Sequence, residues 1–213
     1  MLETVCEIFQ EAYRRNWITA RDGNASVGWN DRDHFYITPS GLRKQNLQPE
    51  QFKRIQLTET LSAVPPFIQE GYTIQEYTDI SSGLNPSGEL PLHLALQRKK
   101  NTDVRVILHM HPTYTVAAMY QGINLQKLVQ EFPELGRYTR VGSTVPDVPP
   151  ISQALADATV PALELESSGA LRNHIVGIDR HGVVAVDTSP WRAFEHIERL
   201  EHICKIVLAS GKY

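Results

Sequence analysis

Apolar residues recur at spacings of three and four at the start of this 213-residue chain. They are Leu2, Val5, Cys6, Ile8, Phe9 and Tyr13. This period predicts an amphipathic helix that belongs to the fold, because an export signal would have a basic segment followed by an apolar one. The same period returns in residues 189–211, where Ser189 is a predicted N-cap, Pro190 the first helical residue and Gly211 the residue after the last turn.

Short β-prone runs separated by turn residues fill much of the rest of the chain. Residues 21–41 are typical of a hairpin, and residues 47–58 and 103–111 of single strands. Residues 173–187 contain two further β-rich runs about a turn at 179–182. The alternation of β-prone runs with turn residues and with longer segments therefore predicts a sheet whose strands are joined both by tight turns and by longer connections.

Three internal helices are predicted between these strands. One runs from Gly88 to Arg98 with Ser87 as its N-cap, and the others lie within residues 114–122 and 151–167. The stretch from residue 60 to residue 85 has no clear period and is predicted to be a loop or a small excursion. Strands separated by helices predict an α/β protein with a central mixed, largely antiparallel sheet covered by helices on both faces.

Composition narrows the class of protein. A chain of this length fits one domain, here residues 1–213. The 24 acidic residues exceed the 21 Lys and Arg, so nucleic acid is not an expected partner. Cys6 and Cys204 lie at opposite ends without metal-type or redox-type spacing, which predicts reduced core residues and a cytoplasmic protein. No apolar run is long enough to span a bilayer, so no membrane partner is expected.

The candidate chemistry begins with His109 and His111, where the apolar run 104–112 ends. Side chains alternate across a strand, so both imidazoles point to the same face and can converge on one metal ion. Imidazole suits zinc, and a catalytic zinc commonly has three protein ligands and one open position. The alternative is that the pair is hydrogen-bonded or solvated structure, so the metal hypothesis needs a third ligand.

Among the other histidines, His181 is the favoured third ligand. It lies in a turn between two apolar runs, where a bend can aim its ring at a neighbouring strand end and Gly182 relieves crowding. His174 opens a predicted strand, and His196 and His202 are expected to be partly exposed side chains on the acidic last helix. The hypothesis is therefore a triad of His109, His111 and His181.

A second group of residues predicts an anion site. Ser87 and Gly88 open a predicted helix, whose free N–H groups and positive dipole end suit phosphate or carboxylate. The turns that contain Asn24, Ser40 and Gly41 could present further donors, although turn chemistry alone also explains them. Glu89 lies in the predicted first turn, where a carboxylate is favourable for structural reasons as well.

Common motifs of other enzyme classes are absent from the sequence. It contains no G-x-x-x-x-G-K-[ST] loop, no strand-linked G-x-G-x-x-G and no G-x-S-x-G nucleophile elbow. Nucleotide handling and serine hydrolysis are therefore not favoured.

Five short blocks occur in an order that resembles one known family. They are "GNAS", "ITPSG", "PSGELPLH", "HMHP" and "RHGVVAVD". Together they resemble the class II aldolase and adducin head family over residues 20–205, almost the whole chain. The resemblance implies a three-layer fold of the class II aldolase type, a sugar-phosphate substrate and a homotetramer with active sites between subunits.

The resemblance also implies roles for individual residues. His109, His111 and His181 would hold Zn²⁺ or another divalent metal, and Glu89 would be the catalytic acid/base. Related epimerases usually have Asp at that place, so Glu favours carbon–carbon cleavage or dehydration. The implied phosphate-binding residues are Asn24, Ser40, Gly41, Ser87 and Gly88. Gly88 departs from the family, because it stands where a second serine is usual and can offer only its backbone N–H.

The leading functional prediction is a zinc-dependent class II aldolase. It would cleave a ketose 1-phosphate reversibly to dihydroxyacetone phosphate and an aldehyde through a metal-stabilised ene-diolate. The alternatives are a sugar-phosphate dehydratase of the methylthioribulose-1-phosphate type and a non-catalytic, adducin-like interaction module. The stretch from residue 60 to residue 85 is longer than the family's usual connection, so the rim of the site is expected to differ.

Overall fold

The computed structural model describes residues 1–28, 33–57, 72–75 (backbone only), 83–99, 103, 105–163 and 172–212. Its strands form one sheet in the order β4-β3-β2-β1-β5-β7-β6, and every pair of neighbours is antiparallel. The strands are β1 Asn24–Gly28, β2 His34–Ile37, β3 Lys53–Leu57, β4 Tyr72–Gln75, β5 Val106–Met110, β6 Ile175–Ile178 and β7 Gly182–Asp187. Among the described residues, parallel contacts are limited to isolated bridges beside β6. The predicted α/β fold with a largely antiparallel sheet is confirmed.

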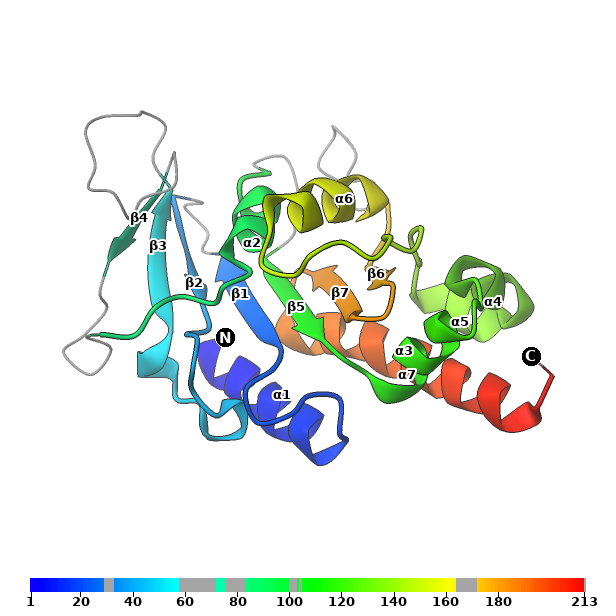
Figure 1. Cartoon of the computed structure of the whole chain (residues 1–213). Coiled ribbons are helices and arrows are strands. Elements are labelled where there is room, and N and C mark those ends of the chain that lie inside the picture. Colours follow the sequence, from blue (N-terminus) through cyan, green and yellow to red (C-terminus); the bar gives the residue numbers. More distant parts are fainter. Residues whose placement is uncertain are drawn as a thin grey trace.

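Helices cover both faces of this sheet (Figure 1). The helices α2 and α6 lie on one face, and α1 and α7 lie on the other. The α-helices are α1 Leu2–Arg14, α2 Leu90–Gln97, α3 Thr113–Tyr120, α4 Leu125–Glu131, α5 Pro133–Tyr138, α6 Gln153–Leu163 and α7 Pro190–Ser210. Two 3-10 turns, η1 Lys44–Asn46 and η2 Pro49–Gln51, precede β3. The result is a three-layer arrangement of helix, sheet and helix.

The alternation of side chains along β5 explains why its apolar residues enter two different cores. Ile107 packs with Leu92 of α2 in the core between the sheet and the helices α2 and α6. Leu108 and Met110 point the other way and pack in the core that contains Phe194 of α7. His109 therefore shares the α2 face with Ile107, so the strand places this imidazole beside the start of α2.

The terminal helices begin and end close to the predicted residues. Before α7, Ser189 has extended backbone angles at the N-cap and Pro190 is the first helical residue. Gly211 ends that helix in the left-handed region with φ 67°. Cys6 of α1 and Cys204 of α7 are buried and unpaired, as predicted.

The predicted start of α2 is wrong by two residues. The N–H of Leu90 donates to the carbonyl of Ser87 at 3.0 Å, which forms a tight turn before the helix. The helix therefore begins at Leu90, and Glu89 is its N-cap residue rather than part of its first turn. This placement matters because the side chain of Glu89 leaves the helix end toward β1 and β5.

The prediction that His196 is partly exposed is also wrong. His196 is buried, and its ring lies between Thr139 Oγ1 at 2.9 Å from Nδ1 and Asp187 Oδ2 at 3.0 Å from Nε2. The amphipathic period of α7 could not reveal this, because the segment that covers His196 is distant in sequence. His202 is exposed as predicted, and His174 directly precedes β6.

Some predictions concern residues outside the described ranges. Residues 29–32 of the predicted hairpin and residues 164–167 of the predicted helix segment lie there, as does most of the unpatterned stretch 60–85. Within that stretch the backbone of β4 is described, and it pairs with β3 at the edge of the sheet. Among the described helices, none combines the length and the apolar character that crossing a bilayer requires.

Candidate metal centre and active site

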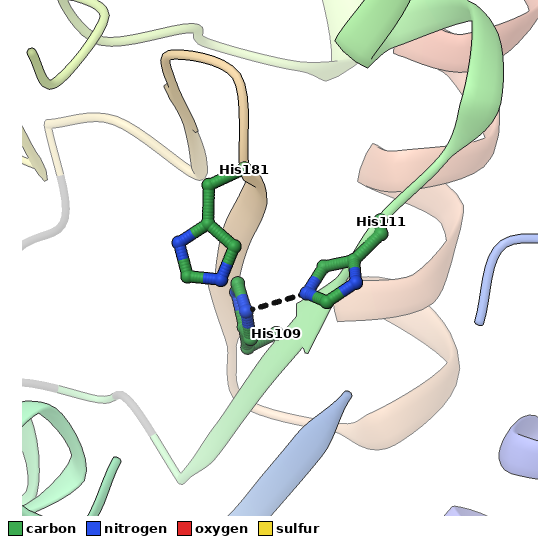
Figure 2. Close-up of side chains that lie close together, drawn as sticks. All are labelled: His109, His111 and His181. Carbon is green, nitrogen blue, oxygen red and sulfur yellow. Dashed lines mark hydrogen bonds between the residues drawn. The ribbon is translucent and has the colours of Figure 1, made fainter. Parts of the chain in front are cut away.

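Three histidines from two distant segments meet at one end of the sheet (Figure 2). His109 lies in β5, His111 follows the strand end, and His181 lies in the turn between β6 and β7. The possible ligand nitrogens of the three residues lie within 4.8 Å of one another. The structure therefore brings together the metal-ligand triad that was predicted from sequence.

The backbone around each ring explains this convergence. His109 stands opposite Val184 of β7, so the β6–β7 turn lies just beyond it in the sheet. Past the strand end, the N–H of His111 donates to the carbonyl of Trp17 at 2.8 Å. In the turn, the N–H of His181 donates to the carbonyl of Ile178 at 3.1 Å. The β-ladder and these turn contacts fix the positions from which the imidazoles project.

Distances and tautomers suit metal binding. His109 Nδ1 lies 3.0 Å from the carbonyl oxygen of Val183, and since a carbonyl can only accept, Nδ1 carries the proton and Nε2 is left with a lone pair. The Nε2 atoms of His109 and His111 are 3.0 Å apart. Two ligand nitrogens of a tetrahedral zinc, each about 2 Å from the ion, lie about 3.3 Å apart. Little movement would be needed to accommodate an ion.

Burial keeps two of these rings neutral at ordinary pH. It lowers the pKa of His109 to about 3, and the pKa of His111 is lowered to about 3 chiefly by burial and then by the other two rings. Neutral imidazole is the form that binds a metal. The donor set therefore fits a divalent ion that prefers nitrogen ligands, such as zinc.

The carboxylate of Glu89 lies directly beside the triad. Its Oε2 is 3.4 Å from His109 Nε2, and its Oε1 is 3.6 Å from His181 Nε2. Glu89 is only 6% exposed, so bulk water has little access to it. A buried carboxylate this close to the ring nitrogens can exchange a proton with a molecule bound at the same place.

A chain of hydrogen bonds holds Glu89 in this orientation. Asn24 Nδ2 donates to Glu89 Oε2 at 2.9 Å, and Asn24 Oδ1 lies 2.6 Å from Nε2 of His93. His93 Nδ1 in turn lies 2.7 Å from Ser26 Oγ. Because an amide oxygen only accepts, His93 carries its proton on Nε2, and burial lowers its pKa to about 3. His93 therefore acts as a neutral bridge between β1 and α2.

Sequence reasoning did not assign a role to His93. The available signal was its spacing, because residues four apart on a helix share a face and His93 follows Glu89 by four positions. Asn24 was predicted to bind phosphate, but its side-chain amide contacts Glu89 and His93. Its phosphate role stays a prediction, while its contacts favour a role in positioning Glu89.

The other predicted anion-binding residues line the same cavity as the triad. This cavity has a volume of about 270 Å³, and its wall includes Ser40, Gly41, Ser87 and Gly88. Several further lining residues were not predicted, among them Arg21, Asp22, Lys44 and Ile151. The predicted metal ligands, the predicted acid/base and the predicted anion-binding residues thus line one cavity.

A second cluster, His174, Asp187 and His196, also has its ligand atoms within 4.8 Å of one another. Here both nitrogens of His196 lie at hydrogen-bonding distance from Thr139 and Asp187, and His174 Nδ1 accepts from the backbone N–H of Arg140. The guanidinium of Arg140 lies 3.1 Å from His174 Nε2. A cation beside that nitrogen opposes metal binding. The cluster therefore joins α7 to β7 and to the segment around Thr139 as part of the structure.

The fold and the site together define a class of protein, an antiparallel α/β scaffold with a histidine triad beside a buried carboxylate. The chain belongs to the family described as Class II Aldolase and Adducin N-terminal domain, whose family model matches residues 3–208. The family resemblance of the five sequence blocks is therefore confirmed. The members of this family are lyases in the comparisons that follow, which supports an enzyme.

Three relatives show the range of named activities. A methylthioribulose-1-phosphate dehydratase from Saccharomyces cerevisiae is 27% identical over 107 residues, which span 50% of this chain but only 37% of that protein. One from Kluyveromyces lactis is 25% identical over 215 residues, covering 97% of this chain and 94% of that protein. A 3-oxo-tetronate 4-phosphate decarboxylase from Escherichia coli is 24% identical, covering 98% and 86%.

Solved structures share the fold. A sugar-phosphate aldolase from Thermotoga maritima superposes with a TM-score of 0.76 at 21% identity, covering 99% of this chain and 97% of that one. An L-fuculose-1-phosphate aldolase from Thermus thermophilus superposes with a TM-score of 0.70 at 21% identity, covering 98% and 92%. At this level of identity the likeness establishes the architecture.

Proposed function

We propose that this protein is a metal-dependent lyase that cleaves a ketose 1-phosphate by a retro-aldol reaction to dihydroxyacetone phosphate and an aldehyde. The observation that carries the proposal is the position of Glu89, 3.4 Å from His109 Nε2 and 3.6 Å from His181 Nε2. An acid/base group beside three converging imidazoles is the arrangement that metal-assisted proton transfer next to a carbonyl requires.

The metal would be held by His109, His111 and His181. When bound, a zinc or similar ion supplies positive charge that polarises a carbonyl and stabilises the negative charge that develops on its oxygen. This chemistry depends on the chain keeping its imidazoles neutral, which burial favours for His109 and His111.

Glu89 is the proposed acid/base. In the cleavage direction its carboxylate accepts the proton of the hydroxyl on the carbon that becomes the aldehyde. The electron pair of the breaking carbon–carbon bond moves toward the neighbouring carbonyl. Glu89 later returns the proton to the carbon beside that carbonyl, the one that has lost its bond to the aldehyde carbon. Asn24 holds Oε2, so Oε1 on the His181 side is the oxygen left to exchange the proton. The cavity wall with Ser40, Gly41, Ser87 and Gly88 would orient the phosphate end.

Dehydration of a sugar phosphate is the second candidate. It is favoured by the Kluyveromyces lactis relative, which matches nearly the whole chain and is named a methylthioribulose-1-phosphate dehydratase. The same acid/base group would remove a proton next to the carbonyl and assist the departure of a hydroxyl as water. The two reactions share a site and differ in which bond breaks.

Product analysis distinguishes them. The metal-loaded protein is incubated with short-chain ketose 1-phosphates and their unphosphorylated forms, and the products are identified by mass spectrometry. Retro-aldol cleavage yields two smaller carbonyl compounds, whereas dehydration keeps the carbon skeleton and removes one water. Metal bound at about one ion per chain is expected by elemental analysis, and a fully folded protein without metal would favour a non-catalytic interaction module instead.

The role of Glu89 is tested by Glu89→Gln. We expect turnover to fall by about a hundredfold or more, because general acid/base catalysis is worth about 10²- to 10⁴-fold, while metal content and folding persist. Glu134→Gln is the matched control, since Glu134 is exposed in the first turn of α5. Unchanged turnover in a folded, metal-loaded Glu89→Gln would contradict the proposal.

The proposal extends to assembly and location. A homotetramer in the cytoplasm, built from a single domain over residues 1–213, agrees with the family resemblance and the two free cysteines. Sedimentation of the purified protein tests the assembly, and a monomer that turns over substrate would remove the tetramer from the proposal.

A further inference from the structure

The cavity beside the histidine triad has a buried positive charge in its wall. Lys44, in η1, is only 2% exposed, and its Nζ donates to the carbonyl of Pro39 at 2.7 Å. An ammonium group has three donors, so two remain after this contact. In the part of the chain that the structure describes, no carboxylate lies within ion-pair distance of Nζ.

This arrangement is unfavourable unless a ligand completes it. A buried charge without a counter-charge costs several kcal/mol, which proteins usually offset with an ion pair. Asp22 attracts Lys44 without forming an ion pair with it, and burial lowers the pKa of Lys44 to about 8. Lys44 and Asp22 both line the cavity of about 270 Å³, so an anion in that cavity would supply the missing charge.

Neutral donors without acceptors lie in the same wall. The backbone N–H groups of Gly41 and Gly88 donate to no acceptor among the described residues. Ser87 Oγ accepts from the N–H of Glu89 at 3.3 Å, and its own hydroxyl proton has no acceptor there either. Gly41 is in the left-handed region with φ 78°, a conformation in which successive N–H groups tend to form an anion-binding concavity. The wall thus combines one buried cation, Lys44, with three neutral donors, while the other cation of the wall, Arg21, is exposed.

We propose that Lys44 is the charged anchor of a phosphomonoester subsite in this cavity, acting together with the N–H groups of Gly41 and Gly88 and the hydroxyl of Ser87. A phosphoryl group carries up to two negative charges and three terminal oxygens, which can accept from all four groups. A carboxylate has two oxygens in one plane and would leave donors unused. The contact with Pro39 holds Lys44 in place before the ligand arrives, so little side-chain freedom is lost on binding.

The inference rests on the proposed function in naming the phosphate end of that substrate, but it also predicts binding of phosphate without turnover. It assigns to Lys44 the positive charge that the five predicted phosphate-binding residues in this wall lack. Gly88 provides one hydroxyl fewer than the serine usual at its position, which makes a charged group in the wall more important for affinity.

The test is calorimetric titration of inorganic phosphate into the metal-loaded protein. Lys44→Met keeps an unbranched side chain without the charge, and Lys44→Gln keeps a donor for Pro39. A charge-assisted hydrogen bond contributes about 1.5–3 kcal/mol, so both variants are expected to bind phosphate about ten- to a hundredfold more weakly. Metal content and melting temperature should be kept, and Lys127→Met, at an exposed lysine of α4, should bind as the unmodified protein does.

Each result decides the matter. Unchanged phosphate affinity in a folded Lys44→Met overturns the inference, and so does acetate binding as tightly as phosphate to the unmodified protein. Unfolding of Lys44→Gln would also overturn it, because the ammonium would then be required by the fold rather than by a ligand. Weaker phosphate binding in the variants, together with no turnover of any ketose phosphate by the unmodified protein, would support Lys44 and contradict the proposed reaction.

Discussion

Gly182 lies so close to His111 that a β-carbon at this position would be 2.6 Å from Cδ2 of the imidazole ring. The same β-carbon would lie 2.4 Å from the carbonyl oxygen of Met110. Neither distance is compatible with van der Waals contact, and the carbonyl belongs to the strand and cannot move aside easily. The absence of a side chain at Gly182 is therefore what allows the β6–β7 turn to bring His181 to the other two rings.

Gly182→Ala should consequently disrupt the metal centre before it disrupts the fold. We expect the added methyl group to push the turn away from β5, so that metal content measured by elemental analysis falls to a small fraction of that of the unmodified protein. Gly211→Ala is the matched control, because Gly211 has φ 67° but a β-carbon there meets nothing within 4 Å. Full metal content in Gly182→Ala would show that the turn can adjust without loss of the site.

The buried His93 predicts a particular dependence of stability on pH. Its pKa is about 3 in the folded protein and about 6.5 in an unfolded chain, so between these values the unfolded state binds the additional proton. The free energy of unfolding should therefore decrease as the pH falls below about 6.5, and His93 contributes up to about 1.4 kcal/mol per pH unit to that slope.

Urea unfolding of metal-free protein between pH 7 and pH 4.5 measures this contribution. His93→Gln should show a shallower dependence of the free energy of unfolding on pH than the unmodified protein. His109 and His111 contribute equally to this slope in both proteins, so their contributions cancel in the comparison. His202→Gln, at an exposed position of α7, should keep the original slope. Equal slopes in all three proteins would mean that His93 does not stay neutral in the folded state.

The convergence of the three histidines could be predicted in part from sequence, because local rules determine much of their geometry. Strand alternation places His109 and His111 on one face of the sheet. The turn that contains His181 is followed by a glycine, which lets the ring of His181 point toward the strand end. The β1–β2 hairpin and the two terminal helices were likewise predictable from their periods and caps. For the hairpin and the two helices, the deciding interactions lie within a few residues of one another. The pairing of β5 with β7, which brings His181 to the other two rings, is long-range.

Other residues of the site depend on contacts that no local pattern reveals. The sequence alone does not distinguish Lys44 from any other lysine in a polar turn, because only the packing of η1 beside the cavity buries it. His93 gains its role from β1, whose residues Asn24 and Ser26 are far away in sequence. His196 was misassigned for the same reason, because Thr139 and Asp187 reach it from other segments.

Glu201 of α7 supports the segment that follows His111. Its carboxylate accepts from the N–H groups of Tyr114 and Thr115 at 2.9 and 2.7 Å, and from Thr115 Oγ1 at 2.8 Å. These donors lie at the start of α3, where negative charge is favourable. Glu201→Gln should lower the free energy of unfolding by about 1–3 kcal/mol, because one oxygen becomes an amide donor that faces other donors.

Thermal or urea unfolding checks this value. Glu195→Gln is the control, since Glu195 forms only a partly exposed ion pair with Arg199 one helical turn away and should cost less than about 0.5 kcal/mol. Equal effects of the two substitutions would mean that the start of α3 is held by its other contacts.

Gly88 offers a way to strengthen the proposed phosphate subsite. A β-carbon there would lie 3.0–3.3 Å from the side chain of Ile151, which is 65% exposed and can move by a few tenths of an ångström. Gly88→Ser should therefore change the free energy of unfolding by less than about 1 kcal/mol. The added hydroxyl should tighten phosphate binding by about two- to tenfold, the equivalent of one hydrogen bond.

The side chain of Ile151 determines how much of this increase in phosphate affinity is obtained. It is a β-branched residue with φ 58°, an unfavourable conformation that leaves its side chain against Gly88. If the isoleucine obstructs the new hydroxyl, Gly88→Ser combined with Ile151→Ala should bind phosphate more tightly than Gly88→Ser alone. If calorimetry instead shows weaker binding in both the single and the double variant, the hydroxyl does not reach the anion, and Gly88 contributes to the cavity through its small size rather than through a donor.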